Sequence, residues 1–149
     1  MYKHILIPTD GSTLAAKGVR EGVKLAKSLG ARITALHVAP PYVRPAYSEG
    51  GIYYAGAFSR HEYEKSTQKA ARKCLGAAQR VARAARVPCR TKLVFDEQYW
   101  QGILRVARSA RCNAIVMASH GRGAVGGLIL GSETSRVLAH SKIPVLVIR

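Results

Sequence analysis

The segment from residue 119 to residue 134 holds the residues best suited to chemistry, because glycines are dense in it. Glycine lets backbone amides approach an anion without a β-carbon in the way. The segment runs into a predicted helix, whose free N–H groups and macrodipole favour negative charge. Ser132 is the predicted N-cap of that helix, although its hydroxyl could bond a phosphate oxygen instead. The pattern predicts a phosphate-binding loop, and the alternative is a surface loop followed by a capped helix.

Two familiar nucleotide motifs can be tested against the same segment. Gly121, Gly123 and Gly126 match the Gly-x-Gly-x-x-Gly fingerprint of dinucleotide-binding proteins. That fingerprint needs an acidic residue about 20 residues further on, and residues 142–146 contain none. A Walker A loop needs Gly-Lys followed by Ser or Thr, and the chain lacks that tripeptide. We therefore reject both motifs.

Asp10 is one of only two aspartates in the chain, and it directly follows an apolar run at residues 3–9. Its carboxylate could bond a ribose hydroxyl or close an Asx turn before the first helix, and both uses remain open. Together with Ser119 and His120 it could form a hydrolase triad on paper. Adjacent residues rarely align a hydroxyl with an imidazole, so we expect no such triad.

The other histidines and the cysteines lack the spacing of a metal site. There is no HExxH pattern and no CxxC pair, and the number of cysteines is odd. We expect reduced, buried thiols, and histidines that lie at the surface or are satisfied in the core. These residues are Cys74, Cys89, Cys112, His4, His37, His61 and His140.

Short apolar runs alternate with helical patterns along the whole chain. The expected strands are residues 3–9, 33–38, 90–95, 114–118 and 143–148, and the expected helices are 15–29, 59–86, 99–111 and 132–140. This alternation predicts one α/β domain, residues 1–149, with a doubly wound, flavodoxin-like sheet of five parallel strands covered on both faces. Such sheets bind ligands beyond the carboxyl ends of the strands, where the winding reverses.

The charge balance is strongly basic. Lys and Arg number 24 against eight Asp and Glu, for a formal net charge of +16. The helix at 59–86 concentrates this charge on one face, which is a solvated surface by default, with a nucleic acid or an acidic protein as the alternative partner. No aromatic residues interleave with these cations, as single-strand binding would favour. The cations of this face are Lys65, Lys69, Arg72, Lys73, Arg80 and Arg83.

No apolar run approaches the roughly 20 residues that span a bilayer, and the first apolar stretch is too short for a signal peptide. We therefore expect a cytoplasmic protein without a membrane contact. The loop at 39–58, rich in proline, glycine and tyrosine, breaks the regular alternation, and its tyrosines could cap a ligand or dock a partner.

A longer pattern is more specific than any of these features. Gly121, nine residues and then Gly131-Ser132 occur together with the runs 7–12, 36–38 and 143–147. In this combination the whole chain resembles the universal stress protein family. The resemblance implies the adenine nucleotide alpha hydrolase-like form of the fold, with strand order 3-2-1-4-5. It also implies ATP, with Mg²⁺, as the ligand, and a homodimer joined through the strand from Ile143 to Ile148.

The resemblance also implies a set of nucleotide-binding residues. Gly121, Gly131, Ser132 and Thr134 would hold the phosphates, with Arg122 in the same loop. Backbone groups of Met117, Ala118 and Glu133 would line the pocket. Pro8, Thr9 and Asp10 would contact the adenosine, and the Val38 backbone would position the adenine. Ala118 stands where the family has its first glycine. An alanine fits this position only if its backbone has ordinary β dihedrals.

These observations lead to an ATP-binding regulatory module of the stress response. ATP would set the conformation of the glycine-rich segment, which partners then read. The alternative is a protein that binds nucleic acid or an acidic partner through its basic surface, with weak ATP binding or none. Catalysis is at most slow ATP hydrolysis, because the sequence offers no positioned general base.

Overall fold

The computed structural model describes residues 1–43, 59–121 and 130–149. Its five strands form a single parallel sheet in the order β3-β2-β1-β4-β5, which confirms the expected fold and strand order. The elements in chain order are β1 His4–Pro8, α1 Thr13–Leu29, β2 Arg32–Ala39, α2 Arg60–Ala84, β3 Cys89–Phe95, α3 Tyr99–Ser109, β4 Ala114–Ala118, α4 Ser132–His140 and β5 Val145–Ile148.

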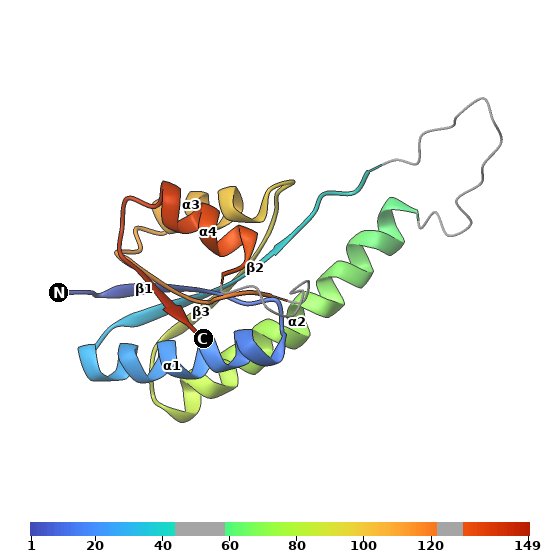
Figure 1. Ribbon diagram of the computed structural model, residues 1–149. Coiled ribbons are helices and arrows are strands. Elements are labelled where there is room, and N and C mark those ends of the chain that lie inside the picture. Colours follow the sequence, from blue (N-terminus) through green and yellow to red (C-terminus); the bar gives the residue numbers. More distant parts are fainter. Residues whose placement is uncertain (44–58, 122–129) are drawn as a thin grey trace.

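Two helical layers enclose the sheet, with α1 and α2 on one face and α3 and α4 on the other (Figure 1). Alternate residues of the central strands pack into two hydrophobic cores, one on each face of the sheet. Ile5 and Ile7 pack with α1 and α2, whereas Leu6 packs with α3. The chain first winds from β1 towards β3 and then crosses to β4 and β5. The winding therefore reverses between β1 and β4, where a ligand site is expected.

Local signals define the ends of α1 and α2. The Ser12 hydroxyl accepts a hydrogen bond from the Ala15 amide at the start of α1, and Gly30 ends the helix with φ +58°. Ser59 and Glu62 form a capping box at the start of α2. That helix ends at Ala84, shortly before Pro88, because Arg86 turns out of it with φ +58°.

The two edge strands differ from the expected sheet. β3 was expected to be covered on both faces, but Arg90, Thr91 and Lys92 are exposed. β5 begins at Val145 rather than at residue 143, because residues 141–144 form a turn in which the Ser141 hydroxyl bonds both the amide and the carbonyl of Ile143. Leu146 on this edge is 46% exposed. Complete coverage therefore holds only for the central strands.

No disulfide joins the three cysteines, and Cys74 and Cys112 are buried as expected, whereas Cys89 is only half-buried. Burial raises the pKa of the Cys112 thiol to about 11, which keeps it protonated. Within the described residues, no cluster of His, Cys, Asp and Glu could hold a metal ion. No described helix is both long and apolar enough to cross a bilayer.

Candidate nucleotide-binding site

A cavity of about 690 Å³ opens where the winding of the sheet reverses, beyond the carboxyl ends of β1, β2 and β4. A volume of this size suits a small-molecule ligand. Every described residue that was predicted to bind nucleotide lines this cavity. These residues are Pro8, Thr9, Asp10, Val38, Met117, Ala118, Gly121, Gly131, Ser132, Glu133 and Thr134. Arg122 lies outside the described residues, as do the tyrosines of residues 44–58.

The segment after β1 forms one wall of the cavity. The Thr9 amide donates to the Leu36 carbonyl at 2.8 Å, and the His37 Nδ1 donates to the Thr9 carbonyl at 2.9 Å, so the ends of β1 and β2 are tied together. Asp10 Oδ1 accepts from the Ser12 amide at 2.9 Å. This is the Asx turn that the sequence left open, and it orients the carboxylate over the cavity.

Gly121 brings the opposite wall close to Asp10. A β-carbon on Gly121 would lie 2.6 Å from Asp10 Oδ2, a distance that real β-carbons do not reach. A side chain at residue 121 would therefore force the Asp10 carboxylate to move away, so glycine keeps the end of the β4 segment close to it. The beginning of the glycine-rich segment thus faces the tip of β1, as a shared ligand site requires.

Gly131 closes the same segment at its other end. Its amide donates to the Ser119 carbonyl at 2.7 Å, and a β-carbon there would lie 3.1 Å from the His120 Cα. The residue at 131 must therefore be small for α4 to begin directly beside the end of β4. This contact fixes the distance between the two ends of the segment.

The start of α4 differs from the sequence prediction. Gly131, with φ −71° and ψ 153°, is the N-cap, and no side chain caps the helix, so the prediction of Ser132 as N-cap was wrong. Ser132 is the first helical residue. The Thr134 hydroxyl donates to the Ala118 carbonyl at 3.1 Å and anchors the helix to β4. Ser132, Glu133 and Thr134 of the first turn line the cavity, so the start of α4 lies beside it without a capping side chain, an arrangement that suits an anion.

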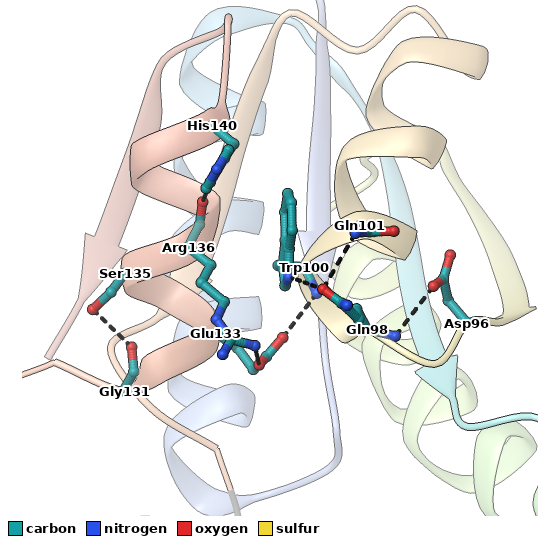
Figure 2. A network of polar contacts seen from close by, with 9 residues as sticks. All are labelled: Asp96, Gln98, Trp100, Gln101, Gly131, Glu133, Ser135, Arg136 and His140. Atoms are coloured by element: carbon teal, nitrogen blue, oxygen red, sulfur yellow. Dashed lines mark hydrogen bonds and ion pairs between the residues drawn. The ribbon is translucent and has the colours of Figure 1, made fainter.

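Glu133 has a second role that sequence reasoning missed (Figure 2). Its Oε2 accepts from the Trp100 amide at 2.9 Å, in the first turn of α3, where Gln98 provides no side-chain cap. Its Oε1 pairs with Arg136 at 3.3 Å. A carboxylate from α4 therefore caps α3 and joins the two helices that flank the cavity. The partners are 33 residues apart, so no local pattern could reveal the contact.

Ala118 departs from the family pattern without a visible cost to the backbone. It ends β4, and the described non-glycine residues with positive φ are only Arg86 and Arg111. The ordinary dihedrals that its methyl group requires are thus present. The Ala118 side chain fits this position.

The Ser119 hydroxyl and His120 Nδ1 lie 3.1 Å apart, a contact that sequence neighbours rarely make. Ser119 is only 2% exposed, and unlike His120 it does not line the cavity. The pair therefore cannot present the hydroxyl to a ligand in that cavity.

Further residues, most of them apolar, also line the cavity. They are Ala15, Leu36, His37, Tyr99, Ile103, His120 and Leu130. The end of β2 could have been found from the predicted sheet, since it neighbours β1. The α3 residues could not have been predicted to line the cavity. Their close approach to β2 depends on Gly102, where a β-carbon would lie 2.9 Å from Val38 Cγ1.

This is a parallel α/β sheet with a glycine-bordered, uncapped helix start at its reversal point, an arrangement that suits an anionic ligand. The model of the Universal stress protein family matches residues 1–149, and the chain belongs to that family.

Two relatives match the full length of both chains at 30% identity: the universal stress protein in the QAH/OAS sulfhydrylase 3'region of Thermus aquaticus and the universal stress protein YxiE of Bacillus subtilis. The structure of the universal stress protein UspA from Lactobacillus plantarum superimposes with a TM-score of 0.77 at 26% identity, covering 99% of this chain and 98% of that one.

Two further solved structures are described as complexes. One is a universal stress protein with cAMP, at TM-score 0.71, 19% identity and 99% and 97% coverage. The other is the universal stress protein from Archaeoglobus fulgidus with dAMP, at TM-score 0.68, 17% identity and 99% and 98% coverage. At identities below 20%, the similarity to these two structures shows a shared fold.

Proposed function

We propose that this protein binds ATP with Mg²⁺ in the cavity at the reversal point, and that it acts in the cytoplasm as a nucleotide-dependent regulatory module of the stress response. The observation that carries the proposal is the uncapped start of α4, which lies beside the end of β4, with Gly131 as its N-cap and Gly121 packed closely against Asp10. A polyphosphate satisfies such amides with charge-assisted hydrogen bonds.

The other half of the cavity suits the adenosine. Val38, Ile103 and Met117 supply apolar contacts for a base, and the backbone at the end of β2 is available for hydrogen bonds to its edge. Asp10 also lines the cavity, and its carboxylate can accept a hydrogen bond from a ribose hydroxyl. The complexes of distant relatives with cAMP and dAMP support an adenine nucleotide as the ligand class.

The donor set fits a magnesium ion that arrives with the nucleotide. No described cluster of acidic residues, histidines and cysteines forms a protein cage. Mg²⁺ commonly binds phosphate oxygens and water, with one or two carboxylates, and Asp10 and Glu133 are the carboxylates that line the cavity. Bound there, the ion would neutralise phosphate charge beside these two side chains.

We further propose a homodimer through β5, within the strand first expected from Ile143 to Ile148. Leu146 lies 46% exposed on this edge strand, and an uncovered apolar edge favours pairing with another strand. Light scattering after gel filtration tests this: a dimer should become a monomer in Leu146→Lys, and a monomeric parent protein would refute the proposal.

Isothermal titration calorimetry with MgATP tests the ligand. We expect one site per chain, and loss of at least tenfold in affinity in Gly131→Val, whose side chain would collide with the His120 backbone. Circular dichroism must show that the variant remains folded. Absence of heat and of a thermal shift at millimolar MgATP would end the ATP proposal, and unchanged affinity in the folded variant would mean that the site lies elsewhere.

A further inference from the structure

The outward face of α2 carries a row of cations, here called the basic stripe. At 3.6 residues per turn these cations fall within about 100° of the helix circumference. The buried residues of the helix, among them Ala71, Cys74 and Ala78, lie on the opposite side. All members of the basic stripe are exposed, and they are Lys65, Lys69, Arg72, Lys73, Arg80 and Arg83.

Among the residues that the structure describes, no acidic side chain forms an ion pair with the basic stripe. The sequence from Lys65 to Lys92 contains no Asp or Glu. The ion pairs of the described residues involve Glu21, Glu64, Asp96 and Glu133, and each of these acids pairs with a cation outside the stripe. The positive potentials of the six cations therefore add up over the outward face of α2.

The neighbouring strand does not extend the stripe. On β3, Cys89 and Leu93 pack into the core beneath α2. Since side chains alternate along a strand, Arg90 and Lys92 point to the other face of the sheet. The basic stripe is thus a feature of one helix, with a straight axis and a defined width.

We propose that the basic stripe binds double-stranded nucleic acid through its phosphates, independently of sequence. From Lys65 to Arg83 the row runs about 27 Å along the helix, at a rise of 1.5 Å per residue. A DNA duplex presents one negative charge per roughly 1.7 Å of its axis. A rigid, straight row of cations matches a stiff, regular polyanion, and neutralising its phosphates releases condensed counterions.

Other polyanionic partners fit the stripe less well. Single strands bind through stacking on aromatic side chains, and no aromatic residue occurs from Lys65 to Lys92. A membrane-bound helix needs a free apolar face, whereas that face of α2 packs on the sheet. An acidic protein would need apolar or aromatic anchors at the centre of the contact, and the stripe offers none.

The stripe is independent of the proposed nucleotide site. α2 covers the face of the sheet opposite α4 (Figure 1). No residue of α2 lines the cavity at the reversal point. Duplex binding can therefore succeed or fail separately from ATP binding.

Fluorescence anisotropy with a labelled DNA duplex of arbitrary sequence, about 20 bp long, tests the proposal. For six phosphate contacts we expect affinity to fall by about 10³-fold between 50 and 200 mM salt. Neutralising four stripe cations should weaken binding at least tenfold at 50 mM salt and reduce the salt slope from about −5 to about −2. The stripe variant carries Lys69→Gln, Arg72→Gln, Arg80→Gln and Arg83→Gln.

A matched control removes the same net charge from exposed positions on other elements. It carries Arg20→Gln, Lys27→Gln, Arg108→Gln and Lys142→Gln. Its affinity should stay within about threefold of the parent protein, because these cations lie outside the stripe. Thermal unfolding of both variants establishes that they are folded.

Three results would overturn the proposal. One is absence of duplex binding at 50 mM salt. Another is an equal loss of affinity in the stripe variant and the control, which would assign binding to overall charge. The third is tighter binding of a single strand of the same length, or of vesicles rich in anionic lipid, than of the duplex.

Discussion

Replacing Glu133 tests whether one carboxylate joins the two helices beside the cavity. Its Oε2 accepts from the Trp100 amide at 2.9 Å and so serves as the cap that Gln98 does not provide. A cap contributes about 1 kcal/mol, and a carboxylate near a helix N-terminus adds about 0.3–1 kcal/mol. Arg136 is 54% exposed, so its ion pair with Glu133 contributes little.

These magnitudes give different expectations for two substitutions. Glu133→Gln keeps an acceptor for the Trp100 amide but loses the charge, and should destabilise the fold by about 1 kcal/mol. Glu133→Ala loses both and should cost about 2 kcal/mol. For a chain of this length 1 kcal/mol corresponds to roughly 3 °C, so the Tm should fall by about 3 and 6 °C respectively.

Thermal unfolding followed by circular dichroism measures both values. Glu97→Ala is the matched control, because Glu97 is exposed and lies directly before Gln98. Its effect should stay within about 0.5 kcal/mol. If Glu133→Ala were as stable as Glu97→Ala, the carboxylate would not hold the two helices together and the reasoning would be refuted.

Three further substitutions probe close approaches and burial. Gly131→Ala should lower MgATP affinity, because its β-carbon would lie 3.1 Å from the His120 Cα. The control Gly76→Ala should leave the affinity unchanged, because its β-carbon would lie 3.6 Å from the nearest side-chain atom. Equal affinities of the two variants in calorimetry would refute this prediction. Gly102→Ala should destabilise the fold by about 1–3 kcal/mol in urea unfolding, because its β-carbon would lie 2.9 Å from Val38, and a neutral result would contradict that approach. Burial and then Arg32 lower the pKa of His4, so the unfolded chain takes up this proton at a higher pH than the folded chain. The contribution of neutral His4 to the free energy of unfolding is therefore complete above the ordinary pKa of 6.5, and it is lost as the pH falls towards the lowered pKa. The stability of His4→Gln should therefore fall less steeply than that of the parent protein below pH 6.5. Parallel profiles of stability against pH for the variant and the parent protein would count against this prediction.

The fold was predictable because local and global signals agree. The central strands are short apolar runs, and Gly30 ends α1 as predicted, whereas α2 ends at Ala84, two residues before the predicted end at residue 86. The exposed face of β3 was missed although Arg90 and Lys92 alternate with apolar residues, which is typical of a half-exposed strand, and the strand order places β3 at an edge.

The site was predictable where glycine itself carries the information. Gly121 and Gly131 were expected beside the ligand, and both border the cavity where a side chain would collide. The cap of α4 was assigned wrongly because serine is the commoner N-cap, while the Gly131 amide bond to Ser119 sets the helix start one residue earlier. The Glu133 contact to α3 arises only from tertiary packing.

The most direct test of the central claim is a two-dimensional ¹H–¹⁵N NMR titration with MgATP. We expect the largest shifts at the amides of Gly121, Gly131 and Ser132, with smaller ones at Val38. Shifts confined to the basic stripe of α2, or none at millimolar MgATP, would contradict a nucleotide held at the start of α4.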